Sequence, residues 1–159
     1  MAALTVGFGL LTGVAAAQEN PLAGAVNRAL VDADRTAEVL DRTEEAAEAL
    51  FTYDYRDPAG HRKTFDELTT GSFADRYSEL FDATLAQAAE QQYSLSSAVA
   101  NAGVRVLTKG EAEVLVFLDQ TGTRGDTNQQ SQGNAMFLAT MRQDDGDWKV
   151  ADMDLFEGQ

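Results

Sequence analysis

Apolar residues in the C-terminal part of the chain, from Ser94 onward, fall into short segments separated by turn signals. The breaks are Thr108-Lys109-Gly110, Asp119-Gln120-Thr121-Gly122 and Asp144-Asp145-Gly146-Asp147. Because strands joined by glycine-bearing turns form consecutive hairpins, this pattern predicts a curved antiparallel meander of four strands. The predicted strands span about residues 95–108, 111–120, 134–143 and 147–156.

Several of these strands are apolar on both faces. The second contains Val114–Leu118, a continuous apolar run, and simple alternation in the fourth places Trp148 and Val150 opposite Met153 and Leu155. A strand that is apolar on both faces is covered on both faces. One cover is a layer of helices; the other is a cavity enclosed by the curled sheet, a partner protein or a second copy of the chain.

The connection between the second and third strands, Thr121–Asn134, is long and rich in Gly, Thr, Asn and Gln. We expect a flexible hairpin loop here, with a functional lid as the alternative.

The residues that precede the strands in the sequence show the apolar periodicity of helices. A helix over about residues 21–56 begins at Pro21 after the N-cap Asn20 and is stopped by Asp57-Pro58-Ala59-Gly60. Its expected buried stripe is alanine-rich and typical of packing on a sheet. The stripe comprises Val26, Leu30, Ala33, Ala37, Leu40, Ala47 and Phe51.

Two further helices are predicted, over about residues 64–69 and 73–92. Thr64-Phe65-Asp66-Glu67 is a capping box that opens the first of them, and Ser72-Phe73-Ala74-Asp75 is a near-match for the second. The longer helix carries an apolar stripe that serves either as core or as the lining of a pocket. The stripe comprises Phe73, Tyr77, Leu80, Phe81, Leu85 and Ala88.

The N-terminal residues 1–18 are apolar and uncharged as far as Ala17. They are interpreted as an apolar helix, either a truncated transmembrane anchor or a signal segment, because Ala15-Ala16-Ala17 resembles a cleavage site while the length falls short of a full span. The anchor would make this a single-pass protein of the cell membrane with residues 19–159 as one extracytoplasmic domain; the alternative is a secreted protein. The expected anchor side chains are Leu4, Val6, Phe8, Leu10, Leu11 and Val14.

Composition narrows the choice of partners. The chain has 159 residues, no cysteine and a net charge of −14. Such a surface repels nucleic acid and anionic lipid headgroups, so neither is an expected partner. Without cysteine, disulfides, thiolate catalysis and cysteine-ligated metals are excluded.

Candidate chemistry is sparse. His61 is the only histidine and is flanked by Arg62 and Lys63, which disfavour its protonation; we expect it on the surface. The acidic residues around Asp145-Gly146 lack the spacing of a calcium loop and indicate a hairpin turn instead. We therefore predict no catalytic residue, no cofactor and no metal ion.

The order of elements resembles the cystatin-like, cone-shaped α+β fold shared by nuclear transport factor two, ketosteroid isomerase and the periplasmic domain of a type IV secretion scaffold. Within that order, five segments resemble the Mce-associated membrane proteins of actinobacteria. They are Asn27–Val39, Phe51–Tyr55, Leu68–Tyr77, Ala112–Gln120 and Asp147–Met153. The resemblance implies an anchored, extracytoplasmic, non-enzymatic accessory or scaffold subunit of an Mce lipid or sterol importer.

Three functions follow as hypotheses. In the first, the apolar sheet face binds Mce transporter subunits or a self-copy. In the second, the chain is an isomerase or cyclase of the same fold, for which Asp119, Tyr53 or Tyr55 would supply the chemistry while Asp152 and Asp154 lie near the rim. In the third, the cone binds a small hydrophobic ligand such as a lipid or sterol. The candidate cavity or interface residues are Tyr53, Tyr55, Phe73, Tyr77, Phe81, Phe117, Phe137 and Trp148.

Overall fold

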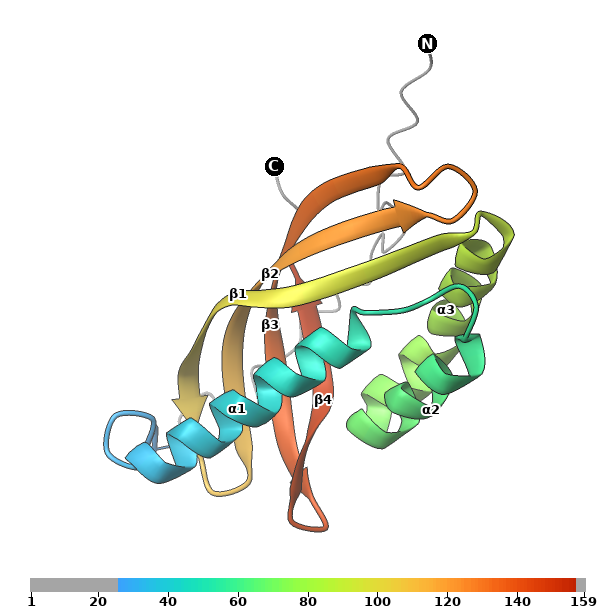
Figure 1. Cartoon of the computed structure of the whole chain (residues 1–159). Coiled ribbons are helices and arrows are strands. Elements are labelled where there is room, and N and C mark those ends of the chain that lie inside the picture. Colours follow the sequence, from blue (N-terminus) through green and yellow to red (C-terminus); the bar gives the residue numbers. More distant parts are fainter. Residues whose placement is uncertain (1–25, 157–159) are drawn as a thin grey trace.

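The computed structural model describes residues 26–156, within which three helices precede four strands. The helices are α1 (Ala33–Leu50), α2 (Pro58–Leu68) and α3 (Gly71–Glu90), and the strands are β1 (Tyr93–Leu107), β2 (Glu111–Arg124), β3 (Gln130–Asp144) and β4 (Asp147–Leu155). The strands form one antiparallel sheet in the order β1-β2-β3-β4, which confirms the predicted α+β class and the meander. In Figure 1 the sheet is bent, α1 lies across it, and α2 and α3 lie side by side.

The two faces of the sheet have different surroundings. Val114, Val116 and Leu118 of β2 are at most 1% exposed and belong to the core that the helices cover. The alternate residues point to the opposite face, where Leu115 is half-buried and Phe117 is 40% exposed. No helix of residues 26–156 covers this second face, which we call the open face.

Helix α1 begins later than predicted. Its N-cap is Asp32, whose side chain accepts a hydrogen bond from the Arg35 amide at 3.3 Å, and not Asn20. Residues 26–32 instead follow the edge of the sheet, because the Asn27 side chain donates to the Arg105 carbonyl and accepts from the Leu107 amide. The predicted helical start at residues 21–25 lies outside the described part of the chain.

The predicted stripe of α1 is confirmed only in its C-terminal part, where Ala47 is buried and Leu40 and Phe51 pack against the core. Of the predicted members, Val26 and Leu30 are 82% and 99% exposed, and Ala33 and Ala37 are exposed as well. The buried residues of α1 share only Ala47 with the predicted stripe. They are Val39, Thr43, Ala46, Ala47 and Leu50. Thr43 is tolerated in the core because its hydroxyl donates to the Val39 carbonyl at 2.6 Å.

Helix α2 begins six residues before the predicted start at Thr64. The Asp57 side chain accepts from the Gly60 amide at 3.0 Å, and Pro58 occupies the first turn. Proline therefore starts this helix and does not merely stop the preceding one, since its missing N–H costs nothing at the first helical position. The Thr64 hydroxyl donates to the Gly60 carbonyl within the same helix and caps nothing. Helix α3 starts at Gly71, two residues before the prediction.

The hairpin between β2 and β3 is longer and its loop shorter than predicted. Thr121 pairs with Gln132 and Thr123 with Gln130, so both strands continue through the segment expected to be a flexible loop. The tight turn before β4 is confirmed: Asp145 and Gly146 have φ values of 51° and 94°, as a two-residue hairpin turn requires.

A bulge in β4 changes which residues enter the core. The register shifts between Thr140 and Met141, where Asp152 and Val150 are the partners and Ala151 is the extra residue. Met153 and Leu155 therefore lie on the same helix-covered face as Trp148 and Val150, and the expectation that they lie on opposite faces was wrong.

The predicted anchor, residues 1–18 with Leu4, Val6, Phe8, Leu10, Leu11 and Val14, lies outside the described residues. Among residues 26–156, no helix is long and apolar enough to cross a membrane.

Candidate functional site

A cavity of about 80 Å³ lies between the helices and the last strand. The end of α1, one face of α2, the apolar stripe of α3 and the end of β4 enclose it. Its lining consists of Leu50, Phe51, Tyr53, His61, Phe65, Phe73, Tyr77, Leu80, Phe81, Thr84, Leu85, Met153 and Leu155. Deep residues such as Phe65 and Phe73 are buried, whereas Tyr77, Leu80 and Met153 are half-buried.

Helical spacing places the aromatic lining. His61 and Phe65 are four residues apart and share the inner face of α2, and Phe73, Tyr77 and Phe81 repeat at the same spacing on α3. The rings contact one another across the two helices: the Phe65 and Phe81 centroids are 4.5 Å apart. The site is therefore a cluster of aromatic rings, and the cavity lies next to this cluster.

His61 is the titratable imidazole of this cavity, and the prediction that it lies on the surface was wrong. Its side chain is turned inward, the residue is 6% exposed, and its ring stacks on Phe81 at 4.8 Å. Nε2 has no hydrogen-bond partner among the described residues. Burial lowers the pKa of His61, while a hydrogen bond to the Leu50 backbone carbonyl opposes that effect. The imidazole is therefore neutral near pH 7, because of burial and not of its basic neighbours.

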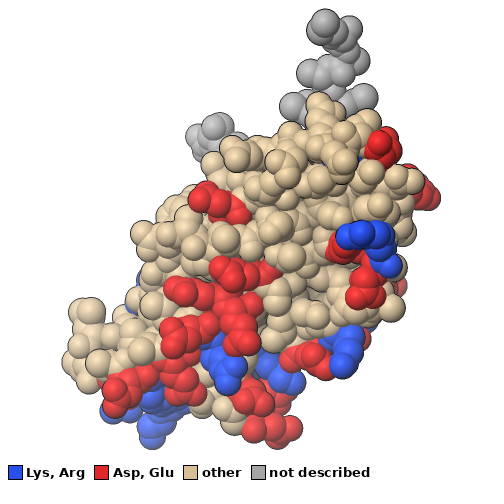
Figure 2. Space-filling view, in the orientation of Figure 1, with Lys and Arg blue, Asp and Glu red and all other residues tan. Residues whose placement is uncertain are grey.

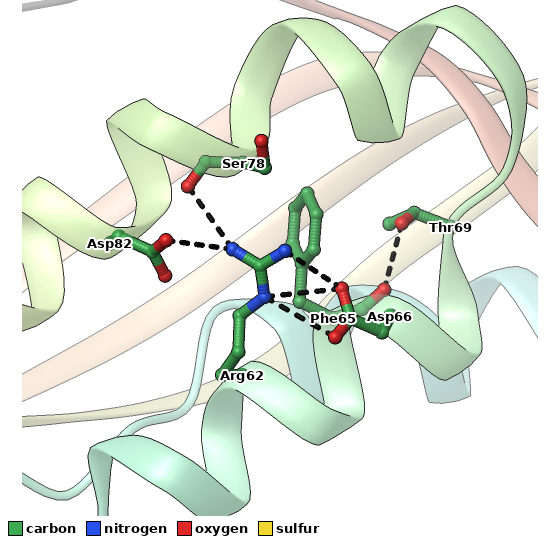
Figure 3. Close-up of polar contacts among 6 residues, drawn as sticks. All are labelled: Arg62, Phe65, Asp66, Thr69, Ser78 and Asp82. Atoms are coloured by element: carbon green, nitrogen blue, oxygen red, sulfur yellow. Dashed lines mark hydrogen bonds and ion pairs between the residues drawn. The ribbon is translucent and has the colours of Figure 1, made fainter.

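The neighbouring Arg62 is not among the residues that line the cavity, and Figure 3 shows its side chain between α2 and α3. It bridges α2 to α3: Nε donates to Asp66 at 3.1 Å on its own helix, and Nη1 donates to Asp82 at 2.8 Å on the other. The guanidinium also lies 5.5 Å from the centre of the Phe65 ring. This contact, which we call the Arg62 bridge, holds together the two helices that enclose His61.

Tyr53 forms part of the wall next to His61, with ring centroids 5.8 Å apart. It is positioned by a short bridge in which its amide donates to the Leu95 carbonyl at 2.8 Å. Burial, and secondarily the nearby Tyr93, raises the pKa of Tyr53 to about 12. The phenol is therefore a neutral donor throughout the physiological range.

The structure brings together half of the residues predicted to line a cavity or interface. Tyr53, Phe73, Tyr77 and Phe81 surround the cavity. Phe137 and Trp148 are 0% and 5% exposed in the core and do not line it. Phe117 lies on the open face. Tyr55 packs against Gly125, and a side chain at position 125 would collide with the Tyr55 ring.

The carboxylates considered for an enzyme lie elsewhere. Asp119 and Asp154 are exposed on the open face, and Asp152 pairs with Arg76 at 2.8 Å. No carboxylate is among the lining residues of the cavity, and residues 26–156 contain no cluster of acidic, histidine or cysteine side chains that could hold a metal ion.

Sequence reasoning missed several lining residues, including His61, Phe65 and Met153. Had Asp57-Pro58 been interpreted as a cap and first turn, His61 and Phe65 would have fallen on one helical face. Met153 could not have been found in this way, because the bulge at Ala151 decides its side of the sheet.

The open face carries a second notable feature, an apolar patch. Phe117, Met136 and Phe156 are 40%, 36% and 43% exposed. Phe117 pairs with Met136 across β2 and β3, and the Phe156 amide donates to the Met136 carbonyl, so the three lie together. The half-buried pair of Leu115 and Leu138 adjoins them. We call these five residues the open-face patch. Figure 2, which views the helix-covered side, shows by contrast many acidic side chains over α1.

The sequence matches no model of a protein family and no curated protein. Similar solved structures exist, however. CagV, a VirB8 homolog of the type IV secretion system of Helicobacter pylori, is 14% identical with a TM-score of 0.65, covering 77% of this chain and 99% of CagV. An IcmL-like type IV secretion system protein of Legionella pneumophila is 12% identical with a TM-score of 0.66, covering 76% and 91%. The periplasmic domain of DotI is 13% identical with a TM-score of 0.62, covering 77% and 95%.

These likenesses show the fold: the chain adopts the cone-shaped, nuclear transport factor two-like α+β fold that the order of its elements resembles. At identities this low, the similarity concerns the arrangement of the backbone and not the activity or the partners.

Proposed function

We propose that this chain is a non-enzymatic interaction subunit outside the cytoplasmic membrane, accessory to an Mce lipid or sterol import system. The observation that carries the proposal is the open-face patch, with three large apolar side chains exposed together on one side of the sheet. Apolar patches of this kind on a soluble surface mark sites of association.

The surroundings of the patch favour a different protein over a second copy. Asp119 and Asp154 are exposed on the same face, close to Phe117 and Leu138. Neither carboxylate has an ion-pair partner among the described residues. With a net charge of −14, a copy-to-copy contact here would bring acid against acid. The expected partner presents an apolar centre with a basic rim.

The size of the cavity argues against carriage of a whole lipid or sterol. Pockets that enclose ligands of that size have volumes of roughly 300–1,000 Å³. The cavity here is about 80 Å³. Asp119, Asp152 and Asp154, the carboxylates considered for an isomerase, are not among its lining residues.

Two comparisons support an extracytoplasmic accessory role. Five segments of the sequence resemble the Mce-associated membrane proteins, and the similar structures include a periplasmic domain, that of DotI, and proteins of type IV secretion systems. We extend these properties to this chain as part of the proposal, with residues 1–18 as its membrane anchor and a secreted form as the alternative.

The test is co-purification of the tagged full-length chain from native membranes, followed by identification of the bound subunits. We expect Mce subunits with the unaltered chain and at least a tenfold loss with the double variant Phe117→Ser, Met136→Ser. Leu30→Ser is the matched control, because Leu30 is 99% exposed but lies outside the patch.

Retention of the subunits by the double variant would refute the role of the patch. The wider proposal would be refuted if no Mce subunit co-purified and deletion of the gene left lipid uptake intact. A homodimer that the double variant dissociates would show that the occupant is a second copy.

A further inference from the structure

We propose that the part of the partner that covers the open-face patch is an amphipathic helix with two basic residues about three turns apart and apolar residues between them. This inference rests on the proposed function, because it takes the patch as the site of association. It adds the kind of element that the partner presents there and the direction in which this element lies.

The first argument is the position of the two exposed carboxylates of the open face relative to the patch. Asp119 of β2 pairs with Asn134 of β3, and Asp154 of β4 pairs with Leu138, four residues further along β3. Met136 lies midway between Asn134 and Leu138 on the same face. A line from Asp119 to Asp154 therefore crosses the sheet diagonally and passes over Met136, in the middle of the patch.

The second argument is the length of this diagonal. Four residues along a strand span about 13 Å, and the spacing from the first strand to the third adds about 10 Å at right angles to it. The two carboxylate residues are therefore about 16 Å apart along the sheet. A helix rises about 1.5 Å per residue, so this separation corresponds to about eleven residues, or three turns.

The third argument is the direction in which side chains point. In a helix, residues i, i+4, i+7 and i+11 lie on one face. Basic residues at i and i+11 would reach Asp119 and Asp154, while apolar residues at i+4 and i+7 would lie on Met136 and its neighbours. In an extended strand, residues of one face recur every 7 Å or so, at about 13 and 20 Å, and neither spacing matches about 16 Å.

The helix-covered face shows that this sheet accepts a helix in the same arrangement. Four buried residues of α1 occupy positions i, i+4, i+7 and i+11 of that helix. They are Val39, Thr43, Ala46 and Leu50. A helix on the open face would be the counterpart of α1, with basic residues at the two end positions because carboxylates flank the apolar side chains there.

The other charges of the open face disfavour a helix that lies along β2 instead of across the sheet. Such a helix would extend from Asp119 to Glu113, which is 4% exposed and pairs with Arg105. The Arg105 guanidinium would repel a basic residue of the partner. Neither Asp119 nor Asp154 has an ion-pair partner among the described residues, so charge complementarity favours the diagonal.

Model peptides test the spacing. The probe is a fluorescent, alanine-based helical peptide of about 18 residues with Lys at i and i+11 and Leu at i+4 and i+7. The matched control has the same composition, with the two lysines moved to i+2 and i+9 on the opposite face. We expect the full-length chain to bind the probe at least about fivefold more tightly than the control in fluorescence anisotropy, because only the probe forms both ion pairs.

Charge reversal tests which groups face each other. Asp119→Lys should weaken binding of the probe about fivefold, and replacement of one of its two lysines by Glu should restore binding, whereas replacement of the other should not. Asp154→Lys should show the reverse preference. The matched control Asp34→Lys changes an exposed position of α1 and should alter binding by less than about twofold.

The inference would be overturned if the probe did not bind, if probe and control bound equally, or if either Glu peptide restored binding to both variants alike. If one of the last two results appeared while Phe117→Ser, Met136→Ser still abolished binding, the patch would remain a site of association and the proposed function would stand. If the peptides behaved as expected but no Mce subunit co-purified, the helix would stand and the partner proposed above would be wrong.

Discussion

Two phenylalanines on neighbouring strands show how position alone sets the role of a side chain. Phe137 of β3 is fully buried and stacks on Phe51 with ring centroids 5.2 Å apart. Phe117 of β2 is 40% exposed, because it points to the open face. The first contributes to folding, and the second remains available for association.

This contrast predicts different costs for the same substitution. Phe137→Ala should lower the free energy of unfolding by about 3–5 kcal/mol, since it removes a buried ring and leaves a cavity. Phe117→Ala should cost less than about 1 kcal/mol, because much of that ring stays in water in the folded state. Urea denaturation measures both; equal losses would contradict the assignment of the two faces.

His61 gives a second prediction, on pH. Burial lowers its folded-state pKa below the usual value of 6.5, so the unfolded chain binds a proton more readily. The stabilisation is therefore present above about pH 6.5 and is lost as the pH falls from there toward the folded-state pKa. Denaturation at several pH values between about 7.5 and 5.5 should show this decline, and it should be smaller in His61→Phe. An NMR titration in which the folded-state pKa of His61 is at or above 6.5 would contradict it.

At the scale of elements, the pair α2–α3 depends on the Arg62 bridge. Arg62 joins Asp66 of one helix to Asp82 of the other and lies over the Phe65 ring. Lys63, the next residue, makes only an exposed pair with Glu67 at 3.6 Å on its own helix. The two cations therefore differ in what they connect.

We expect Arg62→Ala to lower the free energy of unfolding more than Lys63→Ala does, since it removes ion pairs to both helices. Lys63→Ala should cost less than about 0.5 kcal/mol, because exposed pairs contribute little. Hydrogen exchange in α2 should accelerate only in the first variant. Equal exchange rates in the two variants would show that packing alone holds the helices together.

At the scale of the whole molecule, the helices bury one face of the sheet and leave the other for a partner. The open face carries two exposed carboxylates, Asp119 and Asp154, near Phe117. Neither has an ion-pair partner among the described residues. At the opposite end, Arg105 pairs with Glu113 and Arg142 with Glu111. The free carboxylates are thus next to the apolar centre.

If the proposed partner has a basic rim, Asp119→Asn, Asp154→Asn should reduce the association rate about two- to tenfold and flatten its dependence on salt. The matched control is Asp34→Asn, Asp41→Asn, which removes the same charge from exposed positions of α1. Surface plasmon resonance at two ionic strengths measures both. An equal effect of the control would show that only the net charge matters.

Local pattern predicted the strands better than the helices. The four-stranded meander and its Asp145-Gly146 turn follow from alternation and from turn chemistry that neighbouring residues specify. The start of α1 does not follow from local pattern. The side chain of Asn27 forms hydrogen bonds with the backbone of Arg105 and Leu107, about eighty positions away, and these bonds keep the preceding segment out of the helix. The lining residues on α3 were predicted, because they repeat with helical periodicity. His61 was not, because its orientation depends on where α2 begins.

The sequence by itself therefore determined the class of fold, the order of its elements and the aromatic stripe of α3, because these depend on periodicity and on turns that act over a few residues. Only the tertiary structure decided which face each apolar residue occupies. The bulge at Ala151 returns Met153 and Leu155 to the core, the Asp57 cap turns His61 inward, and packing on one side alone leaves Phe117 and Met136 exposed. A shift of one residue in a strand, or of a fraction of a turn in a helix, moves a side chain between core, cavity and surface, and contacts distant in sequence fix that shift.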